Sequence, residues 1–164
     1  MKQVLDYKLE ASEAALWWLG QAGYIVRAAD ITIVIDPYLS DAAAKDAPEL
    51  SRRYPVPVDP AVLSVDIFVV THDHLDHLDP ATISLYKDKE KTWFVAPRQA
   101  AKKLVALGIP EERVVILHAG ESRQFGFVEI TGAFALPTGA DVLDTTGYFI
   151  QFANGRSVYH TSDT

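Results

Sequence analysis

The hydrophobic positions of this chain fall into short runs separated by polar turns, a pattern typical of a strand-rich fold. Three runs near the start predict three successive strands. The run at 65–70 is apolar at almost every position and rich in β-branched residues, which indicates a buried strand. Six further runs follow it. The predicted strands cover residues 14–19, 24–28, 31–35, 65–70, 92–96, 113–117, 125–130, 131–136, 148–152 and 157–160.

Turn and capping residues predict where two helices and one hairpin turn lie along the chain. Asp79-Pro80 combines an N-cap residue with proline at the first helical position, which predicts a helix over about 80–87. An amphipathic segment at 98–107 predicts a second helix, which ends at Gly108. Asn154-Gly155 predicts a tight hairpin between the last two strands. Because strands dominate and helices lie between them, the sequence predicts an α/β fold with a mixed or antiparallel sheet.

Composition narrows the class of protein. At 164 residues, 49% of them hydrophobic, the chain is long enough for one domain over 1–164 with a sizeable core. A net charge of −7 argues against a nucleic-acid partner, since such surfaces are basic. There is no cysteine, which excludes disulfides and thiolate ligands. The start lacks the apolar core of a signal peptide and no run is long enough for a membrane span, so we expect a cytoplasmic protein with no membrane partner.

The clearest chemical signal is a histidine cluster directly after the strand at 65–70. His72, His74 and His77 lie within six residues, with Asp73 and Asp76 between them. A lone histidine is more often structural than a ligand, but three at this spacing are hard to explain as solvated loop residues. Imidazole nitrogens and carboxylate oxygens are ligands of divalent ions. The cluster therefore predicts a metal site, held between a strand end and a helix start.

Four further segments accompany the histidine cluster in a consistent order. They are Trp18-Leu19-Gly20-Gln21-Ala22-Gly23, Asp36-Pro37-Tyr38-Leu39-Ser40, Gly147-Tyr148-Phe149-Ile150 and His160-Thr161-Ser162-Asp163-Thr164. Together with the cluster they resemble the metallo-β-lactamase superfamily of hydrolases, and most closely its ascorbate-6-phosphate lactonase-like branch. The resemblance implies a four-layer αββα sandwich with a metal site at one edge, of which this chain holds the N-terminal part.

The resemblance also implies two divalent ions, with zinc or manganese as the first candidates. It places the first ion on His72 and His74. It places the second on Asp76 and His77, which are also the catalytic candidates. Asp163 would bridge the two ions.

The reaction implied is the opening of a lactone or similar ester by metal-activated water, with a phosphorylated sugar-acid lactone as substrate. Asp36 would lie behind the site and orient a ligand histidine. A small anionic substrate needs a nearby cation, and Arg53, beside Arg52, is the substrate-binding candidate. A solvated pair of charges is the alternative reading of these arginines. Phosphodiester or other ester hydrolysis, and a truncated module without activity, also stay open.

The chain departs from the pattern that it resembles. Residues 135–147 lack the further histidine ligand of the superfamily, and Asp141 or Asp144 would be the oxygen ligands that replace it. Ser162 stands where a glycine is usual. The second half of the fold, with another histidine ligand, does not follow. Since half a sandwich would expose a wide apolar sheet face, we expect a homo-oligomer or a partner chain that completes the fold.

Overall fold

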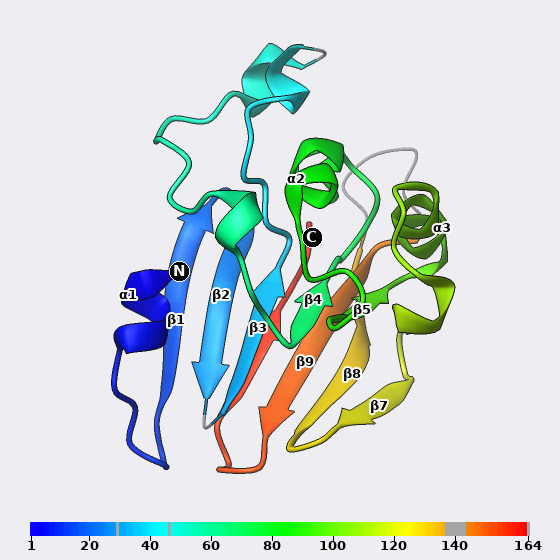
Figure 1. Ribbon diagram of the computed structural model, residues 1–164. Coiled ribbons are helices and arrows are strands. Elements are labelled where there is room, and N and C mark those ends of the chain that lie inside the picture. Colours follow the sequence, from blue (N-terminus) through cyan, green and yellow to red (C-terminus); the bar gives the residue numbers. More distant parts are fainter. Residues whose placement is uncertain (29, 46, 137–143, 164) are drawn as a thin grey trace.

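The computed structural model describes residues 1–28, 30–45, 47–136 and 144–163, and its strands form two sheets packed face to face (Figure 1). The first sheet has six strands in the order β1-β2-β3-β4-β5-β6. Its strands are β1 (Ala14–Gly20), β2 (Gly23–Ala28), β3 (Ile31–Ile35), β4 (Ile67–Val69), β5 (Trp93–Ala96) and β6 (Val114–Ile116). The pairs β1·β2 and β2·β3 are antiparallel, whereas β3 to β6 run parallel. The expected α/β fold with mixed strand directions is confirmed.

The second sheet is antiparallel throughout, in the order β10-β9-β8-β7. Its strands are β7 (Ser122–Phe125), β8 (Val128–Phe134), β9 (Thr146–Phe152) and β10 (Ser157–His160). The hairpin at Asn154-Gly155 is confirmed, with Gly155 at φ +81°. The predicted strands at 125–130 and 131–136 are wrong in their boundary. The turn falls at Gly126 (φ +54°), and residues 128–134 form a single strand.

Helices cover one side of the first sheet (Figure 1). The helical segments are α1 (Lys2–Asp6), α2 (Pro80–Leu85), α3 (Arg98–Ala106) and the short 3-10 turns η1 (Ala43–Lys45), η2 (Pro48–Leu50), η3 (Pro60–Val62) and η4 (Glu111–Arg113). The start of α2 is as predicted, since the Asp79 carboxylate accepts hydrogen bonds from the amides of Ala81 and Thr82. The five-residue α1 was not predicted, because so short a segment carries almost no periodic signal.

Two apolar layers hold these elements together. Ile33, Ile35 and Val69 on the first sheet meet Val128 and Ile150 on the second, and all of them are buried. The opposite face of the first sheet packs against α2 and α3 in a second layer. The central strands are therefore covered on both faces, which explains the nearly continuous apolar run at 65–70.

The outer face of the second sheet carries no helix from the described part of the chain, so the described residues form three layers of the expected four. Phe149 and Tyr159 are 39% and 52% exposed there. They alternate with polar positions such as Glu129 and Gln151 along the strands. This differs from the wide apolar face that we expected, because the broad apolar faces of the two sheets bury each other.

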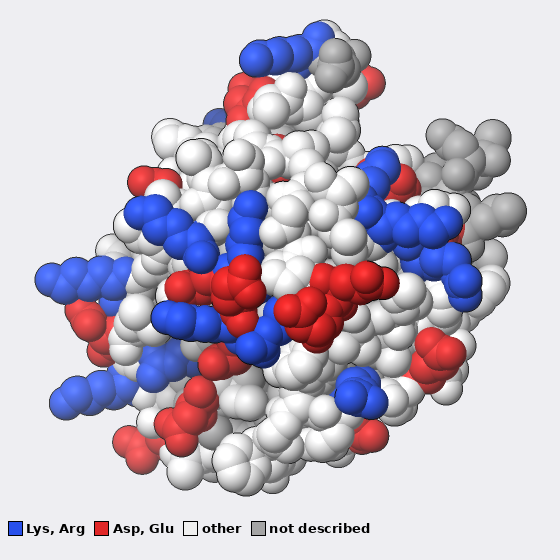
Figure 2. Space-filling model, turned by 45° about the vertical axis from the view of Figure 1, so that its right-hand side comes forward, with Lys and Arg blue, Asp and Glu red and all other residues white. Residues whose placement is uncertain are grey.

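No described helix combines the length and apolar character needed to cross a bilayer. On the side of the molecule drawn in Figure 2, acidic and basic side chains lie intermingled and do not gather into one basic stripe. The absence of a nucleic-acid partner stays a prediction.

Candidate metal centre

The topology brings three separate segments to one edge of the first sheet. Asp36 follows β3 and the histidine cluster follows β4, and these strands are parallel neighbours. Since parallel strands end at the same edge, the two segments lie side by side there. Asp163 arrives from the second sheet, three residues after the end of β10. Residues that are far apart in sequence thus converge where we expect ligands.

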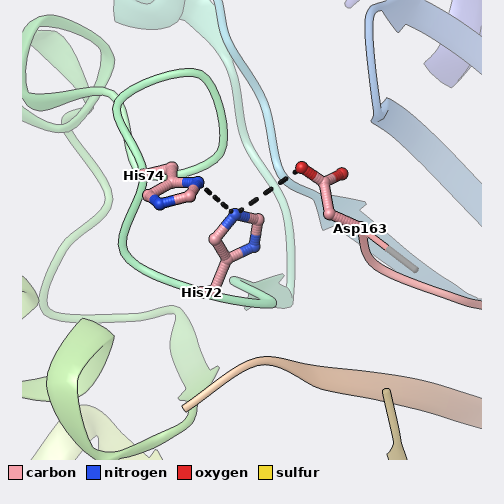
Figure 3. A group of neighbouring side chains, drawn as sticks. All are labelled: His72, His74 and Asp163. Atoms are coloured by element: carbon pink, nitrogen blue, oxygen red, sulfur yellow. Dashed lines mark hydrogen bonds and ion pairs between the residues drawn. The ribbon is translucent and has the colours of Figure 1, made fainter. Parts of the chain in front are cut away.

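A first donor group consists of His72, His74 and Asp163 (Figure 3). His72 Nε2 lies 3.0 Å from His74 Nδ1 and 3.8 Å from Asp163 Oδ2. The donor atoms of the three residues all lie within 4.8 Å of one another. Ligand atoms at about 2.0–2.1 Å from a tetrahedral zinc ion lie about 3.3 Å apart, so a single ion fits this group.

A second donor group shares the Asp163 carboxylate. His77 Nε2 lies 3.3 Å from Asp163 Oδ1 and 3.7 Å from Asp76 Oδ2. The His72 and His77 rings are neighbours, with their centroids 4.0 Å apart. Asp163 therefore turns one oxygen toward each group. The structure brings together all five residues that the resemblance proposed as ligands.

Asp36 lies behind the second group and is fully buried. Its carboxylate accepts hydrogen bonds from the Thr71 amide at 2.8 Å, from the Thr71 hydroxyl at 2.6 Å and from His77 Nδ1 at 2.8 Å. Because Nδ1 donates its proton to Asp36, Nε2 is the nitrogen of His77 that faces Asp76 and Asp163, and it offers a lone pair there once it has lost its own proton. This is the orienting contact expected for Asp36.

The neighbouring charges set the protonation of the site. Burial alone would raise the pKa of Asp36, but the adjacent His77 outweighs it and holds that pKa below its usual value. Burial likewise opposes the charge of His77, yet Asp36 and Asp163 raise its pKa to about 10. Burial, with the nearby His77, lowers the pKa of His72 to about 4. His72 is therefore neutral at pH 7 and has a lone pair to offer, whereas a cation that bound at His77 would have to displace a proton.

Further contacts fix the loop that carries the histidines. Thr71 Oγ1 lies 3.1 Å from His72 Nδ1, and Ser162 Oγ lies 3.4 Å from the same atom. Lys103 on α3 forms an ion pair with Asp73 at 2.6 Å and donates to the Asp73 carbonyl at 2.9 Å. The amphipathic pattern places Lys103 on the exposed side of its helix, and no local signal indicates its partner thirty residues away.

Of the two candidate replacement ligands, the described part of the chain includes Asp144 alone. The Asp144 carboxylate accepts a hydrogen bond from the Gln99 amide and lies 3.8 Å from His118 Nδ1, so it contacts the start of α3. Asp144 does not belong to the donor group found among the described residues. Asp141 lies outside the described residues.

Arg52 and Arg53 line a separate hollow of about 220 Å³ between the end of β1 and residues 49–54, which we call the β1 hollow. None of the donors lines it. The Arg52 guanidinium points inward and donates to the Leu19 carbonyl at 2.6 Å and to the Tyr38 carbonyl. Arg53 is exposed on the rim. The structure therefore places Arg53 at the same edge of the sheet as the metal donors but not in contact with them.

Comparison with known proteins extends these observations. Over 155 residues the chain is 33% identical to a UPF0173 metal-dependent hydrolase of Saccharolobus solfataricus, a match that covers 92% of this chain and 62% of the relative. An isothiocyanate hydrolase from Delia radicum gut bacteria superposes with a TM-score of 0.70 at 19% identity, over 93% of this chain and 63% of that one. Igni18, a metallo hydrolase from Ignicoccus hospitalis, gives a TM-score of 0.66 at 21% identity, over 91% and 60%.

The chain spans less than two thirds of the length of each of these three proteins. The two superpositions show that the chain shares the fold of these structures. Residues 32–164 match the family described as beta-lactamase superfamily domain, a match that runs from β3 through the histidine cluster to Asp163. The chain therefore belongs to the beta-lactamase superfamily domain family.

Proposed function

We propose that this chain carries the metal centre of a hydrolase that opens a lactone or a similar ester. The observation that carries the proposal is the position of Asp163, which directs one oxygen to His72 and the other to His77. Two cations held there would supply Lewis acidity and lower the pKa of a water molecule toward 7. The nitrogen and oxygen donors suit zinc and also manganese.

The chain's own residues hold and orient this centre. Asp36 keeps the lone pair of His77 directed at the second donor group. Asp76, with a side chain only 16% exposed, and His77 flank the position where the attacking water would lie. Lys103 stabilises the loop between the first two histidines through Asp73. Because these supports are in place before any ligand binds, the donors need little rearrangement.

The substrate that we propose is a small anionic molecule, with a phosphorylated sugar-acid lactone as the first compound to test. Arg53 is the candidate for its anionic group. Since the β1 hollow lies beyond the β1–β2 turn, only a substrate that reaches across this turn would contact Arg53 and the metal centre together.

A combined metal and substrate assay tests the proposal. We expect the chain loaded with zinc or manganese to retain two ions and to open lactones, and His74→Ala to lose both properties. Glu129→Ala on the outer face of the second sheet is the matched control. Cleavage of phosphodiesters alone would favour that alternative, and bound metal without any turnover would favour a non-catalytic module. A metal content below one ion per chain after loading with either zinc or manganese would refute the proposal.

We also propose that a second copy of the chain or a partner chain covers the outer face of the second sheet, where Phe149 and Tyr159 are exposed. Sedimentation of the purified chain tests this point separately. We expect a dimer, or a complex with the part of a longer relative that this chain does not match. A well-folded monomer at every concentration tested would contradict the proposal.

A further inference from the structure

The β1 hollow is a second space beside the metal centre, and the donor groups do not account for it. Gly20 and Gln21 line it from one side of the β1–β2 turn. On the other side of that turn, the Ala22 carbonyl accepts a hydrogen bond from His160 on β10, the strand that leads to Asp163. The turn therefore separates the hollow from the donors while linking the two structurally.

The walls of the hollow are fixed before any ligand binds. Gly20 has φ +99°, and a Cβ there would lie 2.6 Å from Nη2 of Arg52, so only glycine lets this guanidinium reach the Leu19 carbonyl. The Gln21 side chain donates to the Leu50 carbonyl at 3.0 Å and ties the opposite wall to the turn. A ligand entering such a preformed space loses little free energy to ordering the protein.

One wall is aromatic and open to solvent. Trp18 and Tyr54 are 53% and 64% exposed, with ring centroids 5.9 Å apart and planes at 73°. The indole nitrogen of Trp18 donates to the Gln21 carbonyl at 2.8 Å, so its polar atom is already satisfied. The two rings therefore leave an apolar ring face and a ring edge open to solvent, nearly perpendicular to each other. A third aromatic ring can pack against such a pair.

Three charged side chains line the hollow, and the guanidinium of one of them, Arg52, already donates to two main-chain carbonyls. Glu49 and Arg53 both line it and both are exposed. Within the described part of the chain, neither forms an ion pair or hydrogen bond, with the other or with a third residue. A simple anion at Arg53 would leave the Glu49 carboxylate without a partner. A small ligand carrying both charges satisfies the two side chains at once.

From these features we infer that the β1 hollow binds an aromatic α-amino acid. Its ring would pack against Trp18 and Tyr54. Its carboxylate would contact Arg53, and its ammonium group would contact Glu49. The inference does not depend on the hydrolase proposal, because no metal donor lines the hollow. A substrate that places its anionic group at Arg53 would compete with this ligand.

Equilibrium binding of L-phenylalanine to the full chain tests the inference, in a buffer with a chelator so that the metal centre plays no part. Calorimetry measures the affinity for L-phenylalanine, and the indole N–H resonances of a ¹⁵N-labelled sample show which tryptophan lies beside the bound ligand. We expect saturable binding that shifts the Trp18 indole resonance and leaves that of Trp93 unchanged. Three analogues each remove one feature: L-alanine the ring, N-acetyl-L-phenylalanine the ammonium group and L-phenylalaninamide the carboxylate.

Variants match the analogues. Trp18→Leu, Arg53→Gln and Glu49→Gln are each expected to weaken L-phenylalanine binding about tenfold or more, and each analogue to weaken it similarly. Arg123→Gln, an exposed arginine on β7, is the control and should bind as the original chain does. Because all four side chains are exposed or half-exposed, the variants should keep the fold, which the amide spectrum verifies.

Several results would overturn the inference. They are the lack of saturation at the solubility limit of L-phenylalanine, an unchanged affinity in Trp18→Leu, or binding of L-alanine as tight as that of L-phenylalanine. Tighter binding of the N-acetyl analogue would show a site for simple anions instead. None of these outcomes bears on metal content or on lactone opening, so a failure here is distinct from a failure of the proposed function.

Discussion

The substitution Asp36→Asn isolates the orienting contact behind the metal centre. Asparagine keeps the size of the side chain and, like aspartate, tolerates the positive φ of +42° at this position. The change removes the negative charge and one acceptor. The new amide group would donate to Nδ1 of His77, so the ring proton moves to Nε2, the atom that faces Asp163. His77 would then present a donor where the cation needs a lone pair.

The magnitude follows from the three hydrogen bonds that the carboxylate accepts. An asparagine oxygen preserves one of them, while the contacts with the Thr71 hydroxyl and with His77 must reverse or break. Hydrogen bonds to a charged group contribute about 1.5–3 kcal/mol each, so we expect the free energy of unfolding of the metal-free chain to fall by about 2–4 kcal/mol. Loss of an orienting carboxylate should weaken metal binding about 10–100-fold.

Two measurements on the same variant separate these effects. Urea denaturation with a chelator present gives the stability, and competition with a chromophoric chelator gives the zinc affinity. Asp79→Asn is the matched control, because Asp79 is also buried but caps α2 and contacts no metal donor. Zinc affinity of Asp36→Asn within about twofold of the original chain would refute the orienting role, whatever the change in stability.

Three further substitutions test the backbone conformation and the packing of the fold. Ser162→Gly should raise the free energy of unfolding by up to about 1 kcal/mol, since Ser162 adopts φ +61°; a clear loss of stability would instead show that its hydroxyl fixes the turn. Gly132→Ala should destabilise the chain by about 3 kcal/mol or more, because its Cβ would lie 2.1 Å from the His118 carbonyl oxygen, and an unchanged melting temperature would contradict that contact. Ile150→Ala, between the sheets, should cost about 2–5 kcal/mol by urea denaturation, whereas Glu129→Ala on the outer face should cost less than about 0.5 kcal/mol.

Most of the fold could be predicted because its strands carry strong local signals. The run at 65–70 is apolar and rich in β-branched residues, and Asn154-Gly155 is a turn dipeptide between two strand patterns. The β7–β8 boundary failed because Ile130 and Thr131 lie in a single strand, with Ile130 facing the core and Thr131 facing out, and the turn depends on Gly126 alone. The packing of two sheets is a long-range property, so the exposed face was overestimated from the sequence.

The candidate metal centre likewise has features that the sequence predicts and features that it does not. The candidate ligands could be named because three histidines lie close together in sequence and because the surrounding segments resemble a known family. The Lys103–Asp73 pair and the inward direction of Arg52 could not be predicted, since both depend on tertiary contacts. Asp144 was a reasonable candidate by composition, yet its carboxylate is occupied by the start of α3.

The first donor group joins the two sheets. His72 and His74 follow a strand of one sheet, and Asp163 follows a strand of the other, about ninety residues later. This group of candidate ligands is thus incomplete until β10 has packed against the first sheet, and closing so long a loop comes late when local contacts form first. An ion bound here would link the two sheets. It would lower the rate at which the sheets separate during unfolding and leave the rates of the early folding steps unchanged.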